Sequence, residues 1–96
     1  MATETFDLVI LGAGPAGLSA SIYAARAGLR CVVFSSGPIG GELPEISHIS
    51  NYPGFVGSGA SLAEAMKKQA EAAGARIDYG KCTRIRQAEA AEGSSP

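Results

Sequence analysis

The sequence predicts an α/β fold in which parallel β-strands alternate with α-helices. Two apolar runs, at residues 6–11 and 31–34, are separated by a glycine cluster and a segment of small residues with helical spacing. A second helical pattern at residues 61–73 precedes a short run at 76–79 that reads as a strand. Strand, glycine turn, helix, strand is the order of a dinucleotide-binding βαβ unit. We therefore expect a three-stranded parallel sheet with two helices.

The glycine cluster has the spacing G-x-G-x-x-G, and each glycine has a separate role. Gly12 allows a sharp exit from the strand, Gly14 lets a pyrophosphate approach the backbone, and Gly17 lets the helix pack closely on the strand. Pro15 suits the first helical turn, where its missing N–H would have had no partner. Unpaired N–H groups and the positive end of the helix dipole favour an anion there; a plain packing turn is the alternative. The residues expected to hold a diphosphate are Gly12, Ala13, Gly14, Pro15, Ala16 and Gly17.

Length and composition exclude several classes of protein. A chain of 96 residues is one small domain at most, and 46% hydrophobic with 18% charged residues is ordinary for a globular protein. The net charge is -1, and no basic run exceeds Lys67-Lys68, which argues against nucleic acid as a partner. No apolar run approaches the roughly 18 residues of a membrane-spanning helix, and the N-terminus lacks the basic residues of a secretory signal.

The cysteines, the histidine and the loop carboxylates form no recognisable catalytic or metal site. Cys31 and Cys82 lie far apart and outside any C-x-x-C motif, which fits a reduced, cytoplasmic setting. Neither is expected to be redox-active, and Cys31 is expected to pack as a small hydrophobic residue. His48 has no Ser-His-Asp or Cys-His spacing around it, so a structural role is favoured. Glu42 and Glu45 lack a third ligand nearby, and we expect no metal.

The first half of the chain gives clear element signals. Residues 8–11 are apolar without alternation, as is typical of a parallel strand covered on both faces. The helix at residues 18–27 should end at Gly28, and the second strand should cover residues 30–34. Residues 35–59 are rich in glycine and proline but too apolar for disorder, so we expect an ordered loop that wraps around a ligand or another segment.

The second half supplies one more helix and one more strand. Ser61 and Glu64 have the spacing of a capping box at the start of the second helix, and Gly74 should end that helix. The third strand is expected at about residues 76–79, with an extension towards residue 85 left open. We expect one domain at residues 1–86, followed by a frayed tail at residues 87–96.

Chain topology has a consequence for the surface. If both crossovers are right-handed, the strand order is 3-2-1 and both helices lie on one face of the sheet. The apolar residues at 8–11 point to both faces, and nothing remaining in the chain can cover the second one. An exposed strand edge and an apolar sheet face are aggregation hazards. We therefore expect this chain to be the first half of something larger.

Two further motifs indicate which protein family the sequence resembles. The glycine cluster, together with residues 22–28, resembles the FAD-binding half of a flavoprotein. Gly40-Gly41-Glu42-Leu43 and residues 51–55 resemble the thioredoxin reductase family, whose members carry G-G-Q-L and N-Y/W-P-G at these places. The resemblance implies a partial Rossmann-like, FAD/NAD(P)-binding fold. In that family NADPH reduces the flavin, which passes electrons to a cysteine pair and then to thioredoxin, and the full-length proteins are homodimers.

The resemblance also implies positions for parts of the cofactor. The pyrophosphate of FAD would lie at residues 12–17, and the adenosine ribose near the end of the second strand. The flavin ring would lie against the loop that follows. Beyond the glycine cluster, the implied cofactor-binding residues are Ser35, Ser36, Gly40, Gly41, Glu42, Leu43 and Asn51.

The sequence departs from the family pattern in three ways. Ser35 and Ser36 stand where many dinucleotide folds have Asp or Glu for the ribose hydroxyls. Glu42 replaces the family's Gln, and a carboxylate beside the flavin should lower its reduction potential. The NADPH domain, the C-x-x-C pair and the returning FAD segment are absent. We therefore expect the FAD-binding N-terminal part of a thioredoxin reductase-like oxidoreductase, inactive alone and without a catalytic residue. The alternative is a non-catalytic adenine-dinucleotide-binding module that needs a partner chain.

Overall fold

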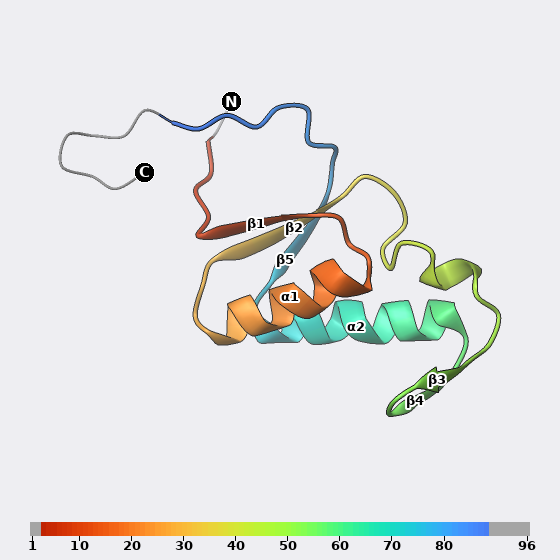
Figure 1. The fold of residues 1–96 in the computed structure, drawn as a ribbon. Helices are drawn as coiled ribbons and strands as arrows, with labels where there is room; N and C mark the ends of the chain where they lie inside the picture. The colour runs from red at the N-terminus through yellow and green to blue at the C-terminus, as the bar shows by residue number, and fades with distance from the viewer. Residues whose placement is uncertain (1–2, 89–96) are drawn as a thin grey trace.

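The computed structural model describes residues 3–88 and contains the predicted three-stranded parallel sheet and two helices. The strands lie side by side in the order β1-β2-β5, which is the predicted 3-2-1 order counted from the other edge. Figure 1 shows that both helices cover the same face of this sheet, as predicted. The elements of this unit are β1 (Leu8–Leu11), α1 (Pro15–Arg26), β2 (Cys31–Ser35), α2 (Gly59–Ala73) and β5 (Arg76–Tyr79).

The core lies between the sheet and the helices. β1 pairs with β2 so that Ile10 lies opposite Val33, and β2 pairs with β5 so that Val33 lies opposite Ile77. Because side chains alternate along a strand, these three residues point to one face, where they pack against the helices. Leu18 of α1 and Ala70 of α2 are fully buried there. Packing this face is what holds the helices on the sheet.

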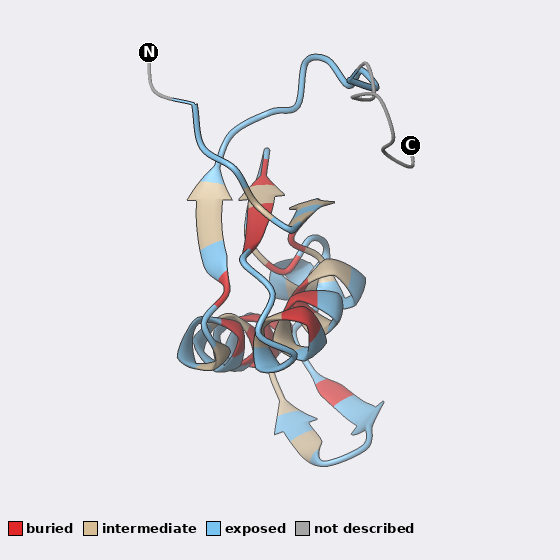
Figure 2. Ribbon diagram, turned by 90° about the vertical axis from the view of Figure 1, so that its left-hand side faces the viewer, coloured by how far each residue is buried: buried red, intermediate tan, exposed pale blue. Residues whose placement is uncertain are grey.

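No helix of the described residues covers the other face of the sheet. Val9 and Leu11 point to it and remain 48% and 49% exposed. Figure 2 shows the helices gathered on one side of the strands and absent from the other. The expectation of an uncovered apolar face is confirmed.

The N-terminal segment is tied to the sheet by charged and aromatic side chains. The guanidinium of Arg76 bonds to Asp78 at 2.8 Å and to Glu4 at 2.5 Å, and these hydrogen bonds raise the pKa of Arg76 further above its usual value. The guanidinium groups of Arg30 and Arg76 lie 4.9 and 5.7 Å from the ring centre of Phe6. These groups are largely exposed, so they order the segment more than they stabilise the fold.

Residues 35–59 contain structure that the sequence did not predict. A short 3₁₀ helix, η1 (Leu43–Glu45), is followed by an antiparallel hairpin of β3 (Ile49–Tyr52) and β4 (Phe55–Gly57). The hairpin turns at Pro53-Gly54, where Gly54 has a φ of 85°. The Pro-Gly pair is a turn signal, but the flanking strands are too short for an alternating pattern to stand out. The segment is ordered, as expected, and the hairpin projects from the body of the domain (Figure 1).

Several element boundaries differ from the expectation. The predicted capping box at Ser61 and Glu64 is wrong: α2 begins at Gly59, and the N-cap is Ser58, whose Oγ accepts the N–H of Ser61 at 3.1 Å. A serine three residues before the predicted cap therefore does the capping, because the helix starts earlier than its apolar stripe.

The other boundaries shift by one to three residues or match. α1 begins at Pro15 instead of residue 18, and β2 is shifted by one residue. Gly28 and Gly74, with φ of 84° and 110°, follow the ends of α1 and α2 as predicted. β5 ends at Tyr79 without an extension. Most of the predicted tail, residues 89–96, lies outside the described residues.

Replacing the N-cap should destabilise the fold more than replacing the residue that the sequence suggested. We expect Ser58→Ala to lower the free energy of unfolding by about 1 kcal/mol, because it removes the acceptor for an N-terminal amide of α2. Ser61→Ala keeps that acceptor and should cost less than about 0.5 kcal/mol. Urea unfolding followed by circular dichroism measures both, and a larger loss in Ser61→Ala than in Ser58→Ala would contradict the assignment.

Candidate functional site

The glycine turn lies between β1 and α1, at the carboxyl end of the strand. The N–H of Gly12 donates to the carbonyl oxygen of Phe34 at 2.9 Å, which carries the β1–β2 pairing one residue past the strand. Gly14 is the N-cap of α1 and offers no side-chain oxygen to the helix. Within residues 3–88, the N–H groups at positions 13, 14, 16 and 17 donate to no backbone or side-chain acceptor. The turn therefore presents free donors at the positive end of a helix dipole.

The glycines of this turn meet two different constraints. A Cβ at Gly17 would overlap the carbonyl oxygen of Gly12 and press on Ile10, so the absence of a side chain there allows α1 to approach β1. A Cβ at Gly14 would meet no protein atom within 4 Å. Gly17 thus serves packing, whereas Gly14 faces open space that a ligand can enter. Open space beside unpaired amides fits a diphosphate, and so fits the phosphate part of FAD.

The loop after β2 returns to this turn. The N–H of Gly40 donates to the carbonyl oxygen of Ala13 at 2.6 Å, and a Cβ on Gly41 would lie 3.4 Å from the Cα of Gly14. Gly40 has a φ of 99° and lies so close to Ala63 of α2 that a side chain would collide with it. The structure therefore brings Gly40 and Gly41, distant in sequence, against the glycine turn.

The rest of this loop is held by α2. The N–H of Gly59 donates to the carbonyl oxygen of Ile46 at 2.8 Å, and the backbone of Leu43 lies so close to Gly59 that a side chain would not fit. The Leu43 side chain packs against the core, while Glu42 is exposed at the start of η1. Glu42 follows Gly41, the residue that lies against Gly14.

The two serines after β2 have different environments. Ser35 is 3% exposed, and its hydroxyl donates to the carbonyl oxygen of Gly37 at 2.6 Å. That proton is engaged within the loop. Ser36 is exposed and lines a hollow of about 250 Å³. The hollow lies where the carboxyl ends of the three parallel strands meet, and its lining residues are Leu11, Gly12, Phe34, Ser36, Gly80, Lys81 and Cys82.

Asn51 is not brought to the turn. It is an exposed residue of β3, whose hairpin projects from the body of the domain (Figure 1). Lys81, by contrast, lines the hollow beside Gly12 although the sequence did not single it out. The sequence feature that could have identified Lys81 is its position two residues after the third parallel strand. Ligands of open α/β sheets bind outside the carboxyl ends of the strands.

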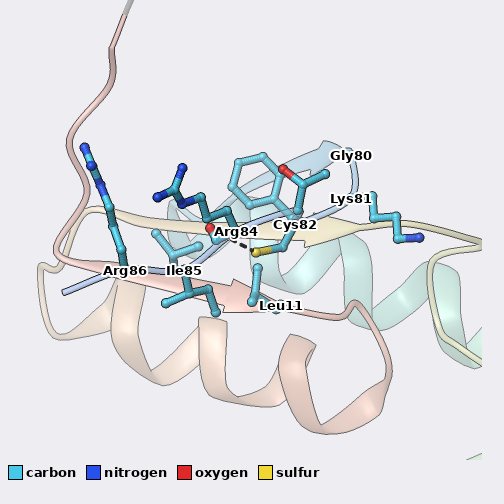
Figure 3. A pocket seen from close by; sticks show the side chains of 10 residues that line it. Leu11, Gly80, Lys81, Cys82, Arg84, Ile85 and Arg86 are labelled. Carbon is cyan, nitrogen blue, oxygen red and sulfur yellow. Dashed lines mark hydrogen bonds between the residues drawn. The ribbon is translucent and has the colours of Figure 1, made fainter.

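A hollow of about 610 Å³ lies on the uncovered face of the sheet (Figure 3). Its floor is Val9, Leu11 and Phe34, and residues 80–86 form its wall. The thiol of Cys82 donates there to the carbonyl oxygen of Arg84 at 3.7 Å. This hollow is apolar sheet surface beside an irregular segment, and it lacks the unpaired amides of the glycine turn.

The described residues do not support a reactive cysteine at position 31, a metal site or a membrane-spanning helix. Cys31 is buried in β2, and burial raises the pKa of its thiol, so it stays protonated and packs as a small hydrophobic side chain. Within residues 3–88 no three or more His, Cys, Asp or Glu side chains gather as metal ligands would, and none of the helices could span a membrane.

Comparisons with known proteins point to the same cofactor. Residues 7–51 match the family described as FAD binding domain. A thioredoxin reductase of Treponema pallidum is 50% identical over 82 residues, which are 83% of this chain and 27% of that protein. A protein of Clostridium pasteurianum, described as a 34.2 kDa protein in the rubredoxin operon, is 51% identical over 76 residues, 78% of this chain and 25% of that protein.

The fold comparison agrees. The crystal structure of a thioredoxin reductase from Streptococcus pyogenes superimposes with a TM-score of 0.82 and 35% identity, over 88% of this chain and 28% of that chain. The chain thus spans about a quarter of the length of the curated relatives it matches.

Replacing Gly17 or Gly14 with alanine should show which glycine is required for packing and which leaves space for a ligand. We expect Gly17→Ala to lower the free energy of unfolding by about 2 kcal/mol or more, because its methyl group overlaps the Gly12 carbonyl and outweighs the better helix propensity of alanine. Gly14→Ala should change it by less than about 1 kcal/mol, because a smaller unfolded-state entropy offsets the poorer N-cap. Urea unfolding of the two variants decides this, and equal stability losses would show that Gly14 also serves packing.

Proposed function

We propose, on the premise that this chain is the FAD-binding part of a thioredoxin reductase-like flavoprotein, that residues 12–17 hold FAD by its diphosphate. The observation that carries the proposal is the set of unpartnered N–H groups at the start of α1. Gly14, one of these residues, borders open space, because a Cβ there would meet no protein atom within 4 Å. An anion at this position gains hydrogen bonds and a favourable dipole without displacing any protein contact.

The flanking segments would receive the two ends of the cofactor. Ser36, beside Gly12 in the hollow at the strand ends, is placed for the adenosine end. Gly41 and Glu42, at the open side of the turn, are placed for the flavin end, with Leu43 anchoring the loop in the core. Asn51 would reach the cofactor only if the hairpin moved towards the turn.

The residues described here bind and orient the cofactor and supply no reacting group. FAD, when bound, supplies two-electron redox chemistry, and the protein's part is position and electrostatics. In the full-length protein we propose the family's order of electron transfer, from NADPH to flavin to a disulfide. The rest of a reductase chain, or a complementing subunit, would cover the exposed sheet face, and the complete protein would be a cytoplasmic homodimer. The comparisons do not favour the alternative of a non-catalytic dinucleotide-binding module.

Amide signals should report the diphosphate directly. We expect FAD to shift the ¹⁵N–¹H resonances of residues 13, 14, 16 and 17 in the 96-residue chain, because these N–H groups are free to donate. Riboflavin, which has the flavin ring but no diphosphate, should leave them unchanged. Shifts confined to other residues, or equal shifts with riboflavin, would overturn the assignment. The same titration detects weak binding, which is what we expect from part of a cofactor pocket.

Gly14→Ala gives the matched variant for this titration. It should weaken FAD binding about tenfold or more, since ~1.4 kcal/mol of lost contact corresponds to a factor of ten. Gly37→Ala is the control, because a Cβ at Gly37 also meets no protein atom within 4 Å and its φ is not in the left-handed region.

The carboxylate of Glu42 should lower the midpoint potential of bound flavin. We expect Glu42→Gln to raise the midpoint potential of bound flavin by roughly 10–30 mV, because removing an exposed negative charge stabilises the reduced anion by less than ~1.4 kcal/mol, which equals ~30 mV for a two-electron couple. Spectroelectrochemical titration of flavin-loaded protein measures the shift. Glu45→Gln, an exposed carboxylate three residues further along, should move the potential less. Equal shifts in both variants would mean that Glu42 has no special proximity.

A further inference from the structure

Three strand ends that are far apart in sequence converge at one hollow. Gly12 follows β1, Ser36 follows β2, and Lys81 follows β5 by two residues, and all three line the space of about 250 Å³ at the carboxyl edge of the sheet. Figure 3 shows the Lys81 side chain extending away from the sheet, beyond the carboxyl ends of the strands. Lys81 and Gly12, the first residue of the glycine turn, therefore line the same hollow.

The hollow has an unusual charge for an adenosine site. Many dinucleotide folds place a carboxylate after the second strand, where it binds ribose hydroxyls. Here the lining contains no carboxylate, and Lys81 is its only charged residue. Ser35 offers no free proton, because its hydroxyl is bonded to Gly37. Lys81 forms no ion pair with any described residue, and it is exposed. An ammonium group that no carboxylate compensates favours an anionic ligand in this hollow.

We propose that Lys81 is a positioning residue for the phosphate groups of the adenine dinucleotide. The inference rests on the proposed FAD site: the backbone amides of the glycine turn grip the diphosphate, and Lys81 supplies the one side-chain charge from the opposite side of the hollow. This role explains how a site made of backbone donors gains long-range attraction, because free amides act only at hydrogen-bond distance whereas a cation acts over about 8–10 Å at moderate salt.

Two substitutions of Lys81 distinguish an effect of its charge from an effect of its packing. Lys81→Gln removes the charge and keeps most of the aliphatic stem, so it should weaken ADP binding three- to tenfold. Lys81→Arg keeps the charge and should bind ADP within about twofold of the parent chain. Lys68→Gln, an exposed lysine on α2 that does not line the hollow, is the matched control and should leave ADP binding unchanged.

The experiment is an NMR titration of the full 96-residue chain and its variants with ADP and with adenosine, at two salt concentrations. We expect Lys81→Gln to weaken ADP binding, to leave adenosine binding unchanged, and to flatten the salt dependence of ADP affinity. Equal ADP affinity in the parent chain and Lys81→Gln would overturn the role of Lys81 and leave the proposed FAD site intact. Parallel loss of adenosine binding would also overturn it, because it would indicate packing instead of charge. Failure of ADP to shift the amides at 13, 14, 16 and 17 in the parent chain would refute the FAD site and, with it, this inference.

Discussion

The close approach of α1 to β1 is the constraint on which the site depends. Because Gly17 has no side chain, the first turn of α1 lies directly against the carbonyl of Gly12, and the chain can pass from strand to helix within three residues. The N-cap of the helix is Gly14, which has no side chain that could accept a hydrogen bond, so the N–H groups at the start of the helix remain without partners. The contact that packs the helix on the sheet therefore also positions the free N–H groups of the proposed anion site.

The loop after β2 packs against this turn. Gly40 can donate to Ala13 only because its backbone adopts a left-handed conformation next to Ala63, and Gly41 then lies over Gly14. α2 holds the loop from the other side through the contact of Gly59 with Ile46. Substitutions in α2 would thus reach the site through the loop, without touching any ligand.

The sequence predicted the part of the fold that follows from local pattern and chain topology. Apolar runs, glycine stops and right-handed crossovers were enough for the sheet order and for helices on one face. The hairpin and the N-cap at Ser58 were missed because short strands carry little periodicity and because several serines compete as caps near one helix start. Lys81 was missed for another reason: no motif spacing marks it, and only its place after the third strand of the predicted sheet could have pointed to the hollow at the strand ends.

The uncovered face of the sheet and the proposed phosphate site share one stretch of chain, which starts at Gly80. Fully burying a valine or leucine side chain is worth about 1.5–3 kcal/mol, so Val9 and Leu11, each about half exposed, forgo a substantial part of the stabilisation that a cover would provide. The wall of the hollow on that face is residues 80–86, and its first residues also line the hollow at the glycine turn. A polypeptide segment that covered Val9 and Leu11 would press on this wall and so hold Lys81 in place. If Lys81 acts as proposed, covering the apolar face and ordering the phosphate site are coupled through this single stretch of chain, and each should make the other more favourable.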